Sequence, residues 1–129
     1  KLSIIMDLTK EWDNVQSEAS GSHLVTGVTI VNNDFLKEHE DLVDTFLQEH
    51  EASIQFTSED PDTAAELIAN AEIVAKAPIA RKALPYCNIT FLSGTEMKEA
   101  LSGYLQALYD QNPASVGGEL PDDGFYYVK

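Results

Sequence analysis

Two histidine–glutamate pairs, His39-Glu40 and His50-Glu51, are the residues most suggestive of metal chemistry. Their histidines are eleven positions apart, which on a single helix is about 16 Å along the axis and too far for one ion. The zinc motif with histidines at i and i+4 and a glutamate between them is absent. We therefore expect both histidines at the surface and no metal site.

The other reactive side chains do not form a catalytic group. Cys87 is the single cysteine, and without a histidine or basic neighbour in sequence it is expected to be a buried, unreactive thiol. Lys76, Arg81 and Lys82 form a basic cluster, which we expect to offset nearby acid rather than bind an anion. The sequence therefore predicts no catalytic residues, no enzymatic activity and no cofactor.

A small polar loop is a better place for a ligand. Residues 17–22 read SEASGS and lead into His23 and a long apolar run. Loops at strand ends carry many of the ligand contacts in α/β domains. For His23 a structural, hydrogen-bonded role is favoured, and a ligand contact stays open.

The apolar run Leu24–Val31 is the element that would position this loop. It is mostly apolar and β-branched, as is typical of a buried strand. Residues 32–34 then break the run with turn chemistry. Apolar residues next recur at helical spacing, at Leu42, Val43, Phe46, Leu47 and Ile54. A strand feeding a helix that packs back on it predicts a layered α/β fold, with Val28 and Ile30 inside a sheet and Phe46 in the core.

Local signals place the remaining elements. Further strands are expected at Leu2–Leu8 and, more weakly, at Asn88–Leu92, which gives a helix-rich α/β fold with two or three strands. Helices are expected over Lys10–Gln16 with Thr9 as cap, after the cap Asp60-Pro61, over Pro78–Leu84, and from a Ser93–Glu96 capping box to Gln111. The aromatic tail around Tyr126 must dock somewhere to stay ordered.

The charge balance restricts the partners. The 129 residues include 22 acidic and 8 basic side chains, a formal net charge of −14, which repels nucleic acid and anionic membrane surfaces. No apolar run approaches the ~20 residues that span a bilayer. Because residue 1 is lysine and no signal peptide is visible, we expect a processed or excised part of a longer chain.

Three motifs in succession resemble the C-terminal part of the substrate-binding proteins of ABC importers. They are Asp34-Phe35-Leu36 after the expected strand, the segment Asp41–Leu47, and the helix start DPDTAA at residues 60–65. The similar group includes nitrate, sulfonate, taurine and thiamine-precursor binding proteins. The resemblance extends over essentially all 129 residues, and the run that begins at Ala83 is similar to the end of such chains.

This resemblance implies one partial domain, residues 1–129, from one lobe of a two-lobe periplasmic binding protein of type II. It implies reversible capture of a small polar or anionic solute, such as nitrate, a sulfonate or a pyrimidine, for ABC permease subunits. Ligand contacts are then expected from Ser20, Gly21, Ser22, His23 and Thr26. The implied location is extracytoplasmic, in a periplasm or lipid-anchored at the outer face of the cytoplasmic membrane. A fragment lacking half its sheet is expected to self-associate.

Two other functions stay open. One is a stand-alone acidic protein-interaction domain, which size-exclusion chromatography would distinguish from a fragment that dimerises or swaps strands. The other is an enzyme similar to thiamine-pyrimidine synthases, which share the implied fold. Those enzymes use histidine-rich and cysteine-rich motifs, whereas this sequence has one cysteine and three scattered histidines.

Overall fold

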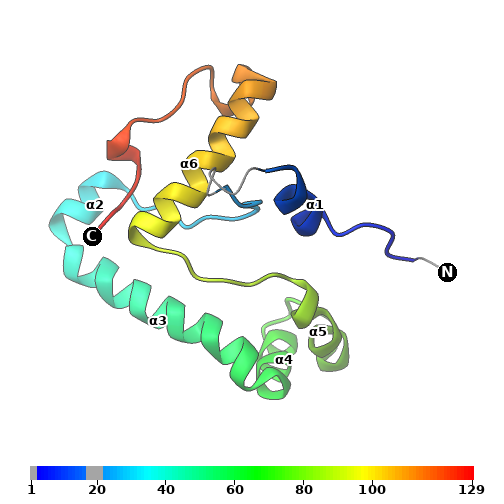
Figure 1. Ribbon diagram of the computed structural model, residues 1–129. Coiled ribbons are helices and arrows are strands. Elements are labelled where there is room, and N and C mark those ends of the chain that lie inside the picture. Colours follow the sequence, from blue (N-terminus) through cyan, green and yellow to red (C-terminus); the bar gives the residue numbers. More distant parts are fainter. Residues whose placement is uncertain (1–2, 17–21) are drawn as a thin grey trace. The chain divides into compact units, whose positions relative to one another are not determined.

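The computed structural model describes residues 3–16 and 22–129, in which helices are joined by extended and irregular segments (Figure 1). The α-helices are α1 (Leu8–Val15), α2 (Asn33–Glu38), α3 (Glu40–Glu59), α4 (Pro61–Asn70), α5 (Ala77–Ala83) and α6 (Gly94–Gln111). Three short 3₁₀ helices are also described: η2 (Leu84–Tyr86) lies between α5 and α6, and η3 (Pro113–Val116) and η4 (Asp123–Phe125) come after α6. The chain forms two compact units: unit 1 is residues 1–29 with 92–129, and unit 2 is residues 30–91.

The predicted α/β fold is wrong, because no strand forms anywhere in residues 3–16 and 22–129. The described parts of Leu2–Leu8, all of Leu24–Val31 and all of Asn88–Leu92 are outside any sheet. Val28 and Ile30, expected inside a sheet, are 59% and 84% exposed. The physical reason is that β-branched residues favour a strand only where a neighbouring strand accepts their hydrogen bonds and covers one face.

Helix α3 and the junction to α4 follow the local signals. Glu40 and Asp41 occupy the first turn of α3, where carboxylates complement the positive end of the helix dipole. Asp60 ends α3 and caps α4, since its Oδ1 accepts a hydrogen bond from the backbone N–H of Thr63 at 3.1 Å. Hydrogen bonds from Thr63 lower the pKa of the Asp60 carboxyl. The predicted Asp60-Pro61 cap is confirmed.

Three other helix starts differ from the expectation. Helix α1 begins at Leu8 and is capped by Asp7, whose side chain accepts from Thr9 and Lys10, so the cap is not Thr9. Ser93 precedes α6 but makes no capping hydrogen bond through its side chain, so the expected capping box is wrong. Helix α5 begins one residue early, at Ala77, and its expected last residue, Leu84, lies in η2. Capping by side chains competes with nearby alternatives that the sequence alone does not rank.

Alanines form the most buried part of unit 2. Helices α4 and α5 pack side by side (Figure 1), and Ala64, Ala65 and Ala80 are 3%, 1% and 2% exposed. Such small side chains let two helix backbones approach closely, which leaves little free volume at the contact. On α3, Val43 is buried, at 8% exposed.

Phe46 on α3, expected in the core, is partly exposed. Its side chain is 46% exposed and stacks on His50 with ring centroids 5.4 Å apart and planes 15° apart. Full burial of a phenylalanine is worth about 1.5–3 kcal/mol, so we expect Phe46→Ala to lower the free energy of unfolding by about 1 kcal/mol. A urea titration monitored by far-UV circular dichroism measures this, and a loss above about 3 kcal/mol would place Phe46 in a closed core.

In unit 1, an aromatic contact joins α1 to α6. The Trp12 and Tyr104 rings have centroids 5.1 Å apart at an interplanar angle of 51°, a tilted geometry that aromatic pairs favour. Trp12 Nε1 donates a hydrogen bond to the Ser22 hydroxyl at 3.2 Å. Ala100 on α6 is buried, whereas Val15 on α1 is 75% exposed.

The aromatic C-terminal tail docks on α6 as expected. Tyr126 is 9% exposed, and the Lys98 ammonium lies 5.8 Å from its ring centroid. The Lys98 Nζ atom is also 2.7 Å from Asp123 Oδ1, and this hydrogen-bonded ion pair lowers the pKa of the Asp123 carboxyl. Burial raises the pKa of the Tyr126 phenol. The buried Tyr126 ring and the Lys98–Asp123 ion pair thus help to hold the tail.

Candidate functional site

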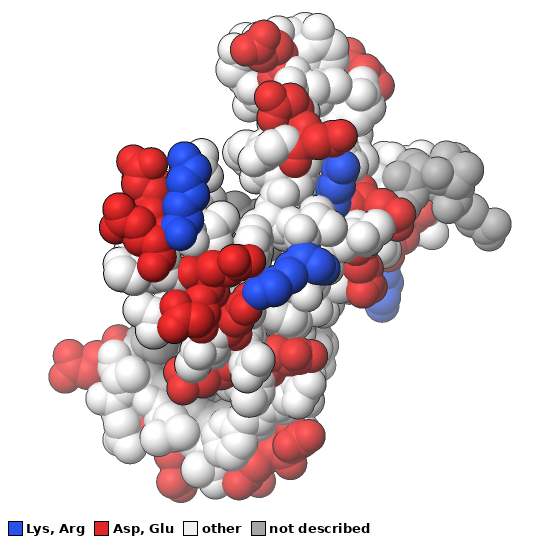
Figure 2. All heavy atoms as spheres, turned by 90° about the vertical axis from the view of Figure 1, so that its left-hand side faces the viewer, with Lys and Arg blue, Asp and Glu red and all other residues white. Residues whose placement is uncertain are grey.

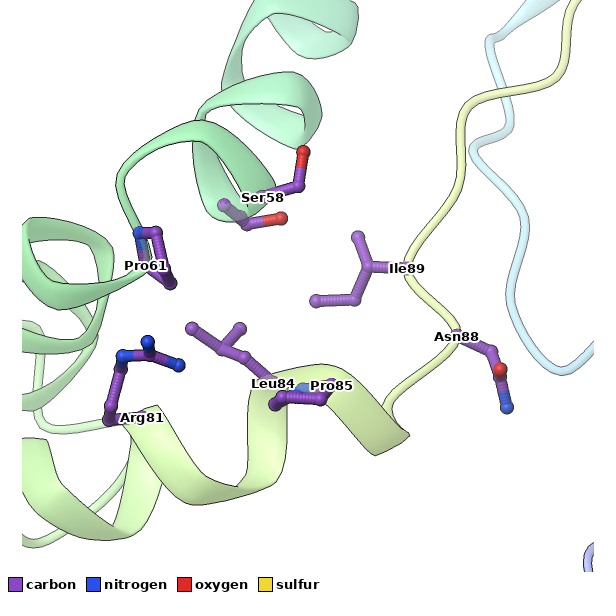
Figure 3. Close-up of a pocket in the computed structure, with 8 residues that line it drawn as sticks. Ser58, Pro61, Arg81, Leu84, Pro85, Asn88 and Ile89 are labelled. Atoms are coloured by element: carbon purple, nitrogen blue, oxygen red, sulfur yellow. The ribbon is translucent and has the colours of Figure 1, made fainter.

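A pocket of ≈ 330 Å³ lies in unit 2, where the end of α3, the start of α4, α5 and η2 meet (Figure 3). Its lining residues come from these elements and from the segment after η2; they are Thr57, Ser58, Pro61, Arg81, Leu84, Pro85, Asn88 and Ile89. The volume is at the small end of ligand pockets, which run from about 300 to 1,000 Å³. It suits a ligand of a few heavy atoms.

One wall of the pocket is the last turn of α3. The Thr57 hydroxyl donates to the Ile54 carbonyl at 2.7 Å, and the Ser58 hydroxyl donates to the Gln55 carbonyl at 2.8 Å. With their hydrogens committed to the helix, these hydroxyl oxygens still have acceptor capacity. This wall can accept a hydrogen bond from a ligand.

The opposite wall carries apolar side chains and one guanidinium. The side chains of Leu84 and Ile89 point into the space, and the Arg81 guanidinium lies between Pro61 and Leu84 (Figure 3). Arg81 Nε donates to Asp62 Oδ1 at 2.6 Å. That hydrogen bond uses one of the five donors of the guanidinium. The donors of the Nη groups can therefore bind a ligand beside the apolar side chains of Leu84 and Ile89.

The lining offers groups that can bind a ligand through hydrogen bonds and apolar contact. The lining contains no carboxylate, histidine or cysteine to act as nucleophile or general base. Among the residues that the structure describes, no group of three or more metal-ligating side chains comes together either. What the pocket offers is one forked cation, hydroxyl acceptors and apolar surface.

Of the five residues expected from the sequence to contact a ligand, Ser22, His23 and Thr26 lie in unit 1. Ser20 and Gly21 fall outside the described residues. Ser22 is buried, at 6% exposed, and its oxygen accepts the Trp12 hydrogen bond. His23 and Thr26 are exposed, and His23 Nδ1 is 3.8 Å from Asp13 Oδ1. Ligand contact at these five residues stays a prediction.

Two side-chain expectations are corrected. Cys87 is exposed rather than buried, with its Sγ 3.3 Å from the Ala83 carbonyl oxygen. His39 and His50, both expected at the surface, are half-buried. The His39 ring lies 4.8 Å from that of Phe35, and the His50 ring lies 5.4 Å from that of Phe46 and 5.9 Å from that of Phe91. The Phe91 contact attaches the segment after the pocket to α3 and thereby positions Ile89.

Arg81 is the pocket residue that sequence reasoning undervalued. The expectation that its cluster offsets nearby acid is met by the ion pair with Asp62. A role in binding depends on Thr57 and Ile89, which are distant in sequence and come together only through the turn from α3 to α5. No local pattern in the sequence marks that juxtaposition.

No known protein family, curated protein or solved structure matches this chain. In the ranges 3–16 and 22–129, no helix is both long enough and apolar enough to cross a membrane. The pocket beside Arg81 is therefore the candidate site.

Proposed function

We propose that this chain reversibly binds a small ligand in the pocket beside Arg81. The ligand has an anionic or strongly accepting end, such as a sulfonate or carboxylate, and a short apolar body. The observation that supports this is the combination of guanidinium donors with the Leu84 and Ile89 side chains in one pocket. Planar N–H groups of arginine recognise such oxygens through two parallel hydrogen bonds.

The negative net charge of the chain repels an anionic ligand only through long-range electrostatic interactions. Figure 2 shows acidic side chains spread over the face in view, with few basic ones among them. At physiological ionic strength the Debye length is about 8 Å, so exposed carboxylates beyond that distance are largely screened. A contact with the Arg81 fork is shorter than this. Asp62 offsets part of the Arg81 charge, so we expect modest, millimolar to micromolar affinity.

The test is a calorimetric titration with butanesulfonate, with butanol as the ligand that lacks the charged end. We expect the sulfonate to bind and Arg81→Met to weaken it about tenfold or more, since hydrogen bonds to charged groups contribute about 1.5–3 kcal/mol. The lost ion pair with Asp62 should hardly change stability, because exposed pairs contribute about 0–1 kcal/mol.

Lys82→Met is the matched control. Lys82 is the next residue on α5, is exposed and does not line the pocket. Lys82→Met therefore removes the same charge but leaves the Arg81 guanidinium in place. We expect it to change affinity by about twofold at most, through the long-range field alone. Equal losses in both variants, or no sulfonate binding at all, would rule out the Arg81 pocket.

The importer role is a separate proposal that the sequence resemblance alone supports. In this role the chain delivers the solute to ABC permease subunits and has an extracytoplasmic location. The proposal does not include the predicted α/β lobe, which the structure contradicts. A stand-alone interaction domain is the second candidate, which the exposed Leu42 (53%) and Phe46 (46%) on α3 favour. Sulfonate binding that Arg81→Met weakens would favour a small-ligand protein over that alternative.

A further inference from the structure

We infer that two copies of this chain associate through their Leu24–Val31 segments. The segment contains three valines, an isoleucine and two threonines, residue types that favour extended, paired backbone. In the structure it belongs to no helix, and Val28 and Ile30 are 59% and 84% exposed. A sequence suited to pairing is thus present and accessible.

The backbone of this segment lacks hydrogen bonds within the described chain. From Leu24 to Val31, no N–H or C=O bonds to another group in residues 3–16 or 22–129. Each residue therefore has one donor and one acceptor that only water or a partner satisfies. An extended backbone in this state can receive a second extended chain along its edge.

The partner that fits is a second copy of the same segment. Residues 19–33 form the longest run of the sequence without Asp, Glu, Lys or Arg. Two chains of net charge −14 repel each other wherever their acidic surfaces meet. Along Leu24–Val31 they can approach without placing charge against charge.

The pairing we propose is antiparallel and two-fold symmetric, so that the same residues meet from both copies. In extended backbone, alternate residues share a face, which puts Thr26, Val28 and Ile30 together. With the two-fold axis at Val28, Val28 of one copy lies opposite Val28 of the other and Thr26 lies opposite Ile30, so residues 25–31 pair. Seven residues at about 3.3 Å each give a contact of about 23 Å, which is small for an interface, so the dimer is weak and concentration-dependent. This contact exists only between copies and does not restore a helix-covered sheet within one chain.

The test is sedimentation equilibrium of the whole chain from micromolar to millimolar concentration. We expect a monomer–dimer equilibrium that tightens as salt is raised, because salt screens the repulsion. The Val28→Lys variant should raise the dimer dissociation constant by about tenfold, since like charges directly opposite disfavour pairing. Amide hydrogen exchange in residues 24–31 should slow with concentration in the unmodified chain only.

Ala52→Lys is the matched control, because Ala52 is exposed on α3 and the substitution adds the same charge. Both variants reduce the net charge to about −13, which favours association, so a loss in Val28→Lys cannot come from net charge. Ile5→Lys tests the other exposed apolar segment, in which Ile5 is 94% exposed. A monomer at all concentrations, or a dimer that Ile5→Lys breaks and Val28→Lys leaves intact, would overturn this inference.

Discussion

Replacing Trp12 with alanine is expected to lower the free energy of unfolding of unit 1 by about 2–3 kcal/mol. Core tryptophans cost about 3–5 kcal/mol when cut to alanine, and Trp12 is half-buried, which reduces that figure. The variant loses the Tyr104 ring contact at 5.1 Å and the donor to Ser22. Urea denaturation followed by far-UV circular dichroism gives the value, since the variant has no tryptophan to report fluorescence.

Trp12→Phe and Val15→Ala divide this effect into its parts. Phenylalanine keeps an aromatic ring against Tyr104 but removes the Nε1–H donor, so the loss should be about 1 kcal/mol from the hydrogen bond to Ser22. Val15 is on the same helix and 75% exposed, so its truncation should cost less than about 0.5 kcal/mol. If Val15→Ala proved as costly as Trp12→Ala, the contact between α1 and α6 would be described wrongly.

Ala65→Leu is expected to destabilise unit 2 by about 1–3 kcal/mol. Ala65 is 1% exposed on α4, which packs against α5, so three added carbon atoms can only be accommodated by moving packed elements apart or straining side chains. The pocket residue Arg81 lies on α5, and Leu84 directly follows α5 in η2. The same substitution should therefore also weaken sulfonate binding, which calorimetry can measure alongside a urea titration.

Ala52→Leu provides the comparison for this second substitution. Ala52 is exposed on α3, where leucine and alanine differ little in helix propensity, so stability should change by less than about 0.5 kcal/mol. A similarly small change in Ala65→Leu would show that α4 and α5 do not pack closely, and the alanine core described here would have to be abandoned.

The helices could largely be predicted from the sequence because their signals are local. Asp60 and Pro61 mark the start of α4 by a side-chain acceptor and a fixed backbone angle, and both act within one turn. The end of α6 at Gln111, before Asn112-Pro113, is equally local. The capping box at Ser93 failed because a cap needs side-chain geometry that the residue types do not determine.

The strands could not be predicted correctly because strand formation is not local. Leu24–Val31 has the composition of a strand, but pairing needs a partner whose distance in sequence is unrestricted. The described chain supplies none, and Val28 is left 59% exposed. The resemblance to substrate-binding proteins assumed that partner, so the predicted fold class was wrong, although α3, α4 and α6 form where the sequence predicts helices.

The sequence indicates only single residues of the candidate site. The sequence shows Arg81 in a basic cluster and predicts that this cluster offsets nearby acid, as the ion pair of Arg81 with Asp62 does. The approach of Ile89 to the last turn of α3 depends on the lengths of α4 and α5 and on the Phe91–His50 contact. These distances are properties of the packed unit, so charge and spacing in the sequence do not reveal the pocket.

The most direct measurement of where a ligand binds is a ¹H–¹⁵N NMR titration of the whole chain with butanesulfonate. We expect saturable shift changes at the amides of Thr57, Ser58, Leu84 and Ile89, which line the pocket, and at the Arg81 side-chain Nε–H. Shift changes centred instead on Ser22, His23 and Thr26 would contradict the Arg81 pocket and return the site to the loop that the sequence suggested.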